Sequence, residues 1–200
     1  MADPIDFYFD FSSPYGYFAA TRIEELAVAN GRLVNWHPIL LGVVFREVGT
    51  ASLTSYPKKG EYSFHDFERT ARFHGIPYNR PPQFPLATQA AARAMLWTAD
   101  NVGEARAIEL AHALYRAMFV DGVRIDRPEE VARIGAAVGL DAEALAKGQD
   151  SEPVRQRLRA ETEQALARGV FGSPFIIVDG EPFWGFDRFA QLDAFLKGTL

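Results

Sequence analysis

The segment IDFYFDFSSPY, residues 5–15, has the pattern of a strand followed directly by the start of a helix. Apolar side chains recur at every second position of its first half, at Ile5, Phe7, Phe9 and Phe11. A period of two predicts a β-strand. Ser13 followed by Pro14 is typical of a helix start, since a hydroxyl caps the free N–H groups and proline fits the first turn. The stretch therefore predicts a strand that passes directly into a helix.

The segments that follow extend this unit into a β-α-β arrangement. The helix is expected to continue to the stop signal Asn30-Gly31, and residues 33–37 predict a second strand. Such a unit usually has parallel strands. Residues 40–62 contain several Gly, Ser and Thr residues and predict a loop region with one helical turn at most, whereas residues 63–150 predict helices alone.

The C-terminal part returns to mixed structure. A helix is expected over residues 151–168, followed by an apolar strand at 175–178. Asp179-Gly180 is a strong hairpin signal, so residues 181–184 predict the return strand. Asp187 is expected to cap the last helix.

Without the helical block, the order of elements is β-α-β-α-β-β-α, which is the order of the thioredoxin fold. We therefore predict an α/β protein with a four-stranded mixed sheet. Residues 1–62 and 151–200 are expected to form the thioredoxin-like domain, and residues 63–150 an inserted all-helical domain.

The composition excludes several classes of function. With 200 residues, 48% of them hydrophobic and 24% charged, the chain has the make-up of a globular protein. A net charge of −5 argues against binding to nucleic acid. The sequence has no long apolar run and no signal peptide, so we expect a cytoplasmic protein that is not bound to a membrane. It has no cysteine, which excludes disulfides and any redox reaction through a pair of its own cysteines.

Metal and nucleotide sites have little support in the sequence. The histidines, at positions 37, 65, 74 and 112, share no ligand spacing, so no metal site is predicted. The sequence also contains no GxSxG, P-loop or GxGxxG motif, which leaves a serine hydrolase or a nucleotide-binding protein without support.

Three short motifs contain the candidate site residues. Ser13 lies at the strand-to-helix junction, where it either stabilises an anion such as a thiolate or only caps the helix. The bond between Ser173 and Pro174 is expected to be cis, which would present the backbone of Ser173 to an extended peptide; a trans turn is the alternative. Asp187 either receives an ammonium group or caps a helix, and Arg188 either meets a carboxylate or is solvated.

The whole chain resembles the 2-hydroxychromene-2-carboxylate isomerases, which are related to the kappa-class glutathione transferases. The segments that carry this resemblance are FYFDFSSPYGYFA at residues 7–19, HPILLGVVFREVG at 37–49 and FGSPFIIVDGEPFWGFDR at 171–188. The resemblance implies a DsbA-like thioredoxin fold with an inserted helical domain, a homodimer and glutathione as cofactor.

The resemblance also implies roles for particular residues. Ser13 matches the serine whose hydroxyl contacts the glutathione sulfur, and Ser173, before Pro174, matches the residue whose backbone pairs with the cysteinyl part. Phe186 and Asp187 match the pair that holds the γ-glutamyl end, and Arg188 ends that motif.

Two positions depart from the family pattern. Thr50 stands where many members have asparagine, which changes the polar contacts expected near the thiol. Ser173 stands where an apolar residue is more common, although a backbone contact survives that change.

The reaction that the resemblance implies converts 2-hydroxychromene-2-carboxylate to trans-o-hydroxybenzylidenepyruvate in the catabolism of aromatic compounds. A thiolate adds reversibly to a conjugated carbon, which allows rotation before it leaves. Arg46, Lys58 and Lys59 are candidate partners for the carboxylate of a small aromatic substrate. The alternatives are a kappa-class-like glutathione transferase, a glutathione-dependent reductase acting on a small electrophile, and a binding module without catalysis.

Overall fold

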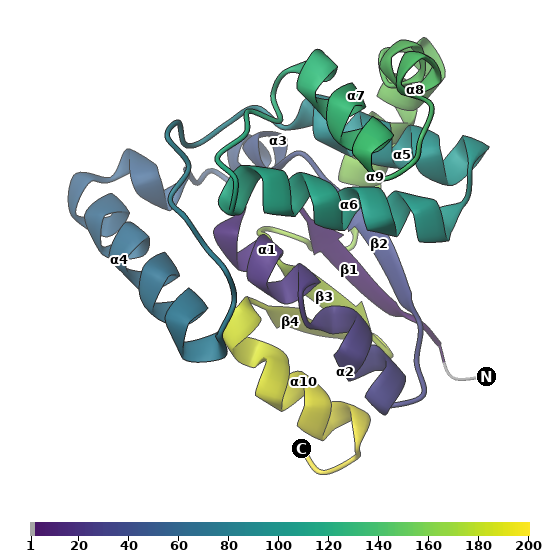
Figure 1. The fold of residues 1–200 in the computed structure, drawn as a ribbon. Helices are drawn as coiled ribbons and strands as arrows, with labels where there is room; N and C mark the ends of the chain where they lie inside the picture. The colour runs from purple at the N-terminus through teal and green to yellow at the C-terminus, as the bar shows by residue number, and fades with distance from the viewer. Residues whose placement is uncertain (1–2) are drawn as a thin grey trace.

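The computed structural model describes residues 3–200, and a mixed β-sheet lies at its centre (Figure 1). Among these residues the sheet has four strands in the order β2-β1-β3-β4. Their bounds are Ile5–Phe9 for β1, Val34–Pro38 for β2, Phe175–Val178 for β3 and Glu181–Trp184 for β4. β1 pairs with β2 in parallel and with β3 antiparallel, and β3 pairs antiparallel with β4. The predicted four-stranded mixed sheet is confirmed.

The predicted first helix is divided into two. α1 runs from Pro14–Ala20 and α2 from Ile23–Ala29. The break falls at Thr21, which ends α1 as its C-cap and whose hydroxyl donates a hydrogen bond of 2.7 Å to the carbonyl of Phe18. A threonine that bonds to its own preceding turn competes with continued helix, which explains the interruption.

The prediction of a loop over residues 40–62 was wrong. This segment contains α3 (Leu41–Glu47), a 3-10 turn η1 (Leu53–Ser55) and the beginning of α4 (Pro57–His74). The N-cap of α3 is Leu40, whose side chain cannot accept a hydrogen bond. The carboxylate of Asp10 accepts instead from the N–H of Leu41 at 2.6 Å, so a residue far away in the sequence caps this helix.

The remaining helices form the upper and lower layers seen in Figure 1. Their bounds are Gln89–Asn101 for α5, Glu104–Phe119 for α6, Pro128–Ala137 for α7, Ala142–Gly148 for α8, Glu152–Ala167 for α9 and Phe189–Leu196 for α10, with a 3-10 turn η2 at Phe186–Arg188. α4 crosses residue 62, where the sequence places a domain boundary, and the division into two domains stays a prediction.

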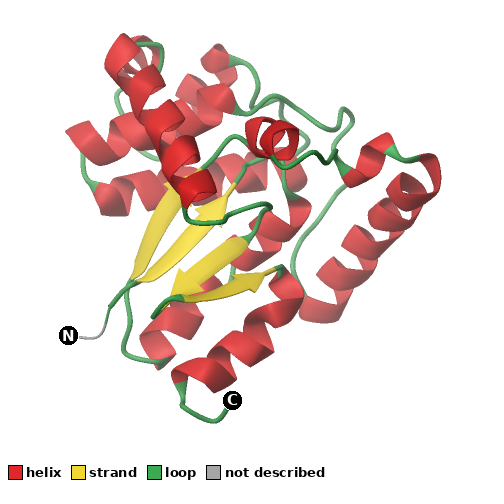
Figure 2. Cartoon of the chain, turned by 180° about the vertical axis from the view of Figure 1, so that it is seen from behind, coloured by secondary structure: helices red, strands yellow, loops and turns green. Residues whose placement is uncertain are grey.

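Both faces of the sheet are covered by helices, as Figures 1 and 2 show. The face that includes Phe7 and Phe9 packs against α1, α2, α6 and α10 in the larger apolar cluster. The opposite face, with Tyr8 and Phe175, packs against α3 and α9. The strand of the opening motif is therefore held from both sides, which fixes the position of the residues that follow it. Within residues 3–200, no helix combines the length and the apolar character needed to cross a membrane.

Candidate functional site

Ser13 lies at the junction of strand and helix, as predicted, and caps α1. Its Oγ accepts a hydrogen bond from the N–H of Gly16 at 3.0 Å. The same hydroxyl donates to the carbonyl oxygen of Ser173 at 2.9 Å. Ser13 is therefore a helix cap and, in addition, the link between the first motif and the C-terminal part of the chain.

Ser173 closes a ring of hydrogen bonds with Ser13 and Asp10. The Ser173–Pro174 peptide is cis, which confirms the prediction. The hydroxyl oxygen of Ser173 accepts from the N–H of Asp10 at 3.0 Å, and the N–H of Ser13 donates to the carbonyl of Asp10 at 2.9 Å. The backbone of Ser173 is thus held beside Ser13 through both its side chain and its carbonyl.

The third motif, which contains Asp187, is held beside the Ser173–Pro174 bend by a backbone hydrogen bond. The N–H of Gly185 donates to the carbonyl of Pro174 at 3.1 Å. Gly185 precedes η2, so this bond places Phe186 and Asp187 next to the Ser173–Pro174 bend. Because the Ser13 hydroxyl bonds to Ser173, about 160 residues later in the sequence, all three motifs meet at this bend.

Asp187 does not cap the last helix, so that prediction was wrong. The N-cap of α10 is Arg188, and it makes no side-chain capping bond, because η2 intervenes between Gly185 and the helix. The side chain of Asp187 is 73% exposed, and its carboxylate lies 3.4 Å from the guanidinium of Arg188, whose side chain is about half-exposed. Phe186 is buried and anchors the segment, with its ring 6.0 Å from that of Phe18. Asp187 is consequently available to a ligand.

Asp10 is a buried carboxylate that the sequence analysis did not single out. It is 4% exposed, and it accepts from the N–H of Ser12 at 2.7 Å, the N–H of Leu41 and the hydroxyl of Thr88 at 2.6 Å. Its backbone carbonyl also accepts from the hydroxyl of Tyr115 at 3.1 Å. Burial, followed by the charge of Asp10, raises the pKa of Tyr115 well above its usual value, so this tyrosine remains a donor. The partners belong to distant helices, and no local sequence signal could have identified them.

Gly16 allows these hydroxyls to approach α1 closely. A Cβ at this position would lie 3.0 Å from Ser173 Oγ, 3.0 Å from Tyr115 Oη and 3.1 Å from Ser13 Cβ. All three separations are shorter than ordinary contacts of a Cβ atom. Only glycine therefore fits beside the ring without displacing its members.

Tyr15 connects the site to α4 and was also missed. Its hydroxyl donates a hydrogen bond to the carboxylate of Asp66, which pairs in turn with Arg69. Burial, the bond to Asp66 and nearby negative charges, including that of Asp187, raise the pKa of Tyr15 above its usual value. The tyrosine is therefore neutral and ties α4 to α1 immediately after Ser13.

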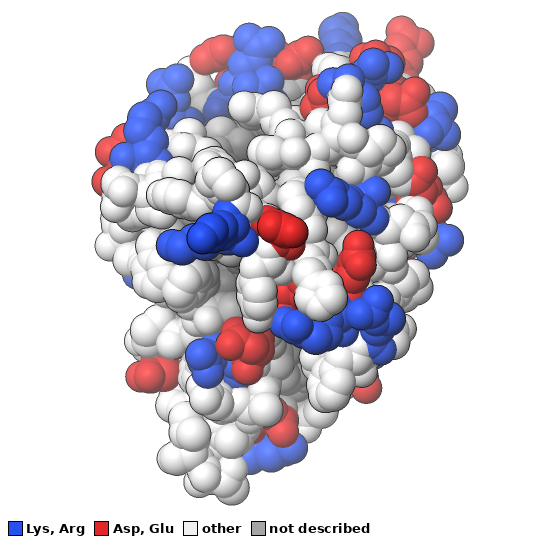
Figure 3. Space-filling model, turned by 90° about the vertical axis from the view of Figure 1, so that its left-hand side faces the viewer, with Lys and Arg blue, Asp and Glu red and all other residues white. Residues whose placement is uncertain are grey.

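Of the other predicted site residues, Arg46 lies in the last turn of α3, Thr50 lies between α3 and α4, and Lys58 and Lys59 lie in the first turn of α4. Thr50, Arg46, Lys58 and Lys59 are all exposed. Within residues 3–200, none of them makes a hydrogen bond or ion pair with Ser13, Ser173 or Asp187. Figure 3 shows the side of the molecule where α4 lies, with basic and acidic groups intermixed over a largely uncharged surface. The roles of these residues stay predictions.

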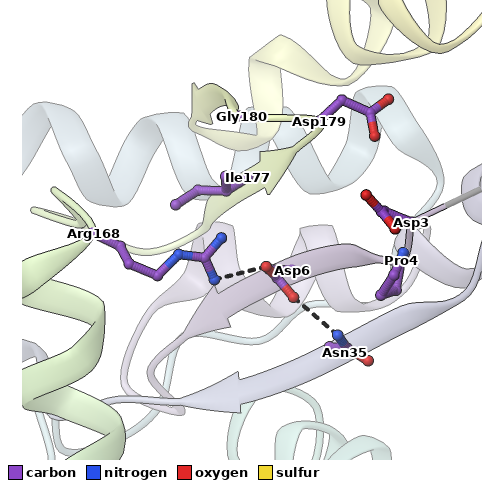
Figure 4. A pocket seen from close by; sticks show the side chains of 8 residues that line it. All are labelled: Asp3, Pro4, Asp6, Asn35, Arg168, Ile177, Asp179 and Gly180. Atoms are coloured by element: carbon purple, nitrogen blue, oxygen red, sulfur yellow. Dashed lines mark hydrogen bonds and ion pairs between the residues drawn. The ribbon is translucent and has the colours of Figure 1, made fainter.

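Two surface hollows lie away from Ser13. One, of about 330 Å³, is found at the start of β1, and Figure 4 shows its lining residues Asp3, Pro4, Asp6, Asn35, Arg168, Ile177, Asp179 and Gly180. Another, of about 340 Å³, lies between the Pro81-Pro82 loop and Arg127. Neither includes Ser13, so the candidate site rests on the convergence of motifs and not on a cavity.

Comparison with known proteins first defines the class. A family model described as "DSBA-like thioredoxin domain" matches residues 4–197, nearly the whole chain. The topology and the cis-proline bend beside the first helix agree with this class, although the chain contains no cysteine.

The relatives then define the family more narrowly. The chain is 31% identical over 201 residues to a 2-hydroxychromene-2-carboxylate isomerase from Sphingobium xenophagum, covering 98% of this chain and 99% of the relative. A solved structure of a 2-hydroxychromene-2-carboxylate isomerase superposes with a TM-score of 0.88 at 27% identity, covering 97% of this chain and 94% of that one. The chain belongs to this isomerase family within the DsbA-like thioredoxin class. It is also 27% identical over 197 residues to glutathione S-transferase kappa 1 from Caenorhabditis elegans, covering 92% and 87% of the two chains.

Proposed function

We propose that the protein is a glutathione-dependent isomerase that converts 2-hydroxychromene-2-carboxylate to trans-o-hydroxybenzylidenepyruvate. The observation that carries the proposal is the hydrogen bond of 2.9 Å between the Ser13 hydroxyl and the Ser173 carbonyl, beside the segment that bears Asp187. Ser13, Ser173 and Asp187 match the positions that the resemblance to the isomerase family implies for glutathione binding. The name of the relative that is 31% identical supports the same reaction.

The donor and acceptor groups present fit glutathione. The Ser13 hydroxyl is a donor for a thiolate, and the Ser173 carbonyl is an acceptor for the cysteinyl N–H. The exposed Asp187 carboxylate can accept from the γ-glutamyl ammonium, and Arg188 can bind a carboxylate. Phe186 holds this segment in place because its ring is buried.

The chain's own residues then have the following roles. Bound glutathione would supply a thiolate that adds reversibly to the conjugated carbon of the substrate. Ser13 keeps its proton and stabilises the negative sulfur by donating a hydrogen bond. Thr50 offers a hydroxyl near the thiol, and Arg46, Lys58 and Lys59 bind the carboxylate of the aromatic substrate. All four are exposed, and they lie from the last turn of α3 to the first turn of α4.

A glutathione transferase or glutathione-dependent reductase is the second candidate. Its support is the kappa-class relative, which is 27% identical over most of the chain. The two functions differ in their stoichiometry, because an isomerase returns glutathione unchanged whereas a transferase consumes it. Cytoplasmic location and a homodimer remain predictions from the sequence.

The test has two measurements on the wild-type protein and the variants Ser13→Ala and Ser12→Ala: calorimetry of glutathione binding, and turnover of the chromene substrate. We expect the wild-type protein to bind glutathione. Turnover of Ser13→Ala should be lower by about 10²-fold, the scale of losing one donor to a developing charge. Ser12→Ala removes a neighbouring hydroxyl and should retain turnover. The absence of binding at millimolar glutathione would contradict both the isomerase and the transferase.

A further inference from the structure

The hydroxyl proton of Ser13 already has an acceptor in the protein. A serine hydroxyl has one proton to donate. Here that proton goes to the Ser173 carbonyl at 2.9 Å, while the oxygen accepts from the Gly16 N–H at 3.0 Å. Ser13 is 6% exposed, so its polar atoms depend on protein partners and not on water. Before it can donate to a sulfur atom, Ser13 has to leave the Ser173 carbonyl.

The Ser173 carbonyl is fixed in its position. The Asp10 N–H holds the Ser173 side chain at 3.0 Å, and the Gly185 N–H holds the Pro174 carbonyl at 3.1 Å. With both neighbouring groups tied, the carbonyl is not free to turn towards another partner. An unsatisfied carbonyl at this place would be unfavourable, so loss of the Ser13 bond requires a replacement donor.

We propose that the cysteinyl N–H of glutathione replaces Ser13 at the Ser173 carbonyl, and that this exchange releases the Ser13 hydroxyl to donate to the sulfur. The proposal rests on the function proposed above and adds a condition to it. The thiol is ionised efficiently only when the peptide backbone of the ligand is seated. Ser13 keeps its proton throughout, and the proton lost by the thiol goes to water.

This exchange makes the site selective for one chemical class of thiol. The ligand must carry an amide N–H on the carbon next to the thiol-bearing carbon, as an N-acylated cysteine does. Thiols without that N–H leave Ser13 bonded to Ser173, and their sulfur lacks the hydroxyl donor.

A thiol-free peptide gives the most direct test. γ-Glutamyl-alanyl-glycine has the backbone N–H but no sulfur, so in the wild-type protein the displaced Ser13 hydroxyl has nothing to bind. Ser13→Ala removes this competition. Calorimetry should therefore show that Ser13→Ala binds the peptide about two- to tenfold more tightly than the wild type, the range of one net hydrogen bond. Ser12→Ala should bind it as the wild type does. Equal or weaker binding by Ser13→Ala would overturn the exchange.

The second measurement follows the thiol itself, through the ultraviolet absorbance of the thiolate. Glutathione is compared with its ester analogue, in which oxygen replaces the cysteinyl N–H. In the wild type the bound ester thiol should ionise at a higher pH than bound glutathione, whereas in Ser13→Ala the two should ionise alike. Identical ionisation of both thiols in the wild type would contradict the exchange.

These outcomes separate the exchange from the function on which it rests. If glutathione does not bind the wild-type protein, both the isomerase proposal and the exchange are refuted. If glutathione binds with its thiol ionised but Ser13→Ala weakens binding of the thiol-free peptide, the isomerase proposal stands and the exchange is refuted.

Discussion

Replacing Gly16 with alanine should damage both stability and the candidate site, because the added methyl group meets the hydrogen-bonded ring. The new Cβ would lie 3.0 Å from Ser173 Oγ, 3.0 Å from Tyr115 Oη and 3.1 Å from Ser13 Cβ. Tyr115 is fully buried and bonded to Asp10, so it has little room to move. Overpacking of this kind costs about 1–3 kcal/mol.

Part of this cost is offset within the helix itself. Alanine is favoured over glycine in a helix by about 0.5–1 kcal/mol, so the net loss for Gly16→Ala should be at most about 2.5 kcal/mol. For a chain of this size that corresponds to a fall in Tm of up to about 10 °C. Turnover should also fall by about tenfold or more, because the added methyl group would displace the side chains of Ser13 and Ser173.

Gly42→Ala in α3 is the matched control, because a Cβ at Gly42 would meet nothing within 4 Å. It should leave stability unchanged or raise it by up to about 1 kcal/mol. Denaturant and thermal unfolding of the two variants measure the difference, together with turnover of Gly16→Ala. A Gly16→Ala protein as stable and active as the wild type would refute the close packing described here.

Three further changes test separate parts of the account. Asp187→Asn should weaken glutathione binding by about tenfold or more, through loss of a charge-assisted contact, while Tm stays constant because the side chain is 73% exposed. An altered Tm with unchanged affinity would assign Asp187 a structural role. Thr88→Val should lower the free energy of unfolding by about 1.5–3 kcal/mol, because it removes a buried donor to the Asp10 carboxylate; an unchanged denaturant midpoint would contradict this. Burial disfavours the charged form of His37, but its hydrogen bond to Glu161 and nearby negative charges outweigh this and raise its pKa above 6.5. The stability advantage of the wild type over His37→Gln should therefore be full below pH 6.5 and disappear as the pH rises through the pKa of the folded state; an advantage independent of pH would contradict it.

The sequence predicted those elements whose signals are local. The alternating apolar residues of β1 and the Asp179-Gly180 turn between β3 and β4 predicted these strands where the structure has them. Ser13 was correctly placed as a cap, because serine and proline at a helix start act on adjacent backbone groups. Short-range chemistry of this kind is readable without a structure.

The errors arose where distant residues determine local structure. The sequence around α3 predicts a loop because the cap of this helix comes from Asp10, which lies 31 residues earlier. The expected helix start at Asp187 is wrong because η2 intervenes, and the helix begins beyond it. The contacts of Asp10 with Leu41, Thr88 and Tyr115 appear only in the folded chain.

The proposed glutathione-dependent isomerisation can be followed by the ultraviolet absorbance of 2-hydroxychromene-2-carboxylate with the wild-type protein, in the presence and absence of reduced glutathione. The free glutathione is quantified before and after the reaction. We expect conversion to trans-o-hydroxybenzylidenepyruvate only when glutathione is present, with all the glutathione recovered and with Ser13→Ala slower by about 10²-fold. Equal conversion without glutathione, or net consumption of glutathione during turnover, would contradict it.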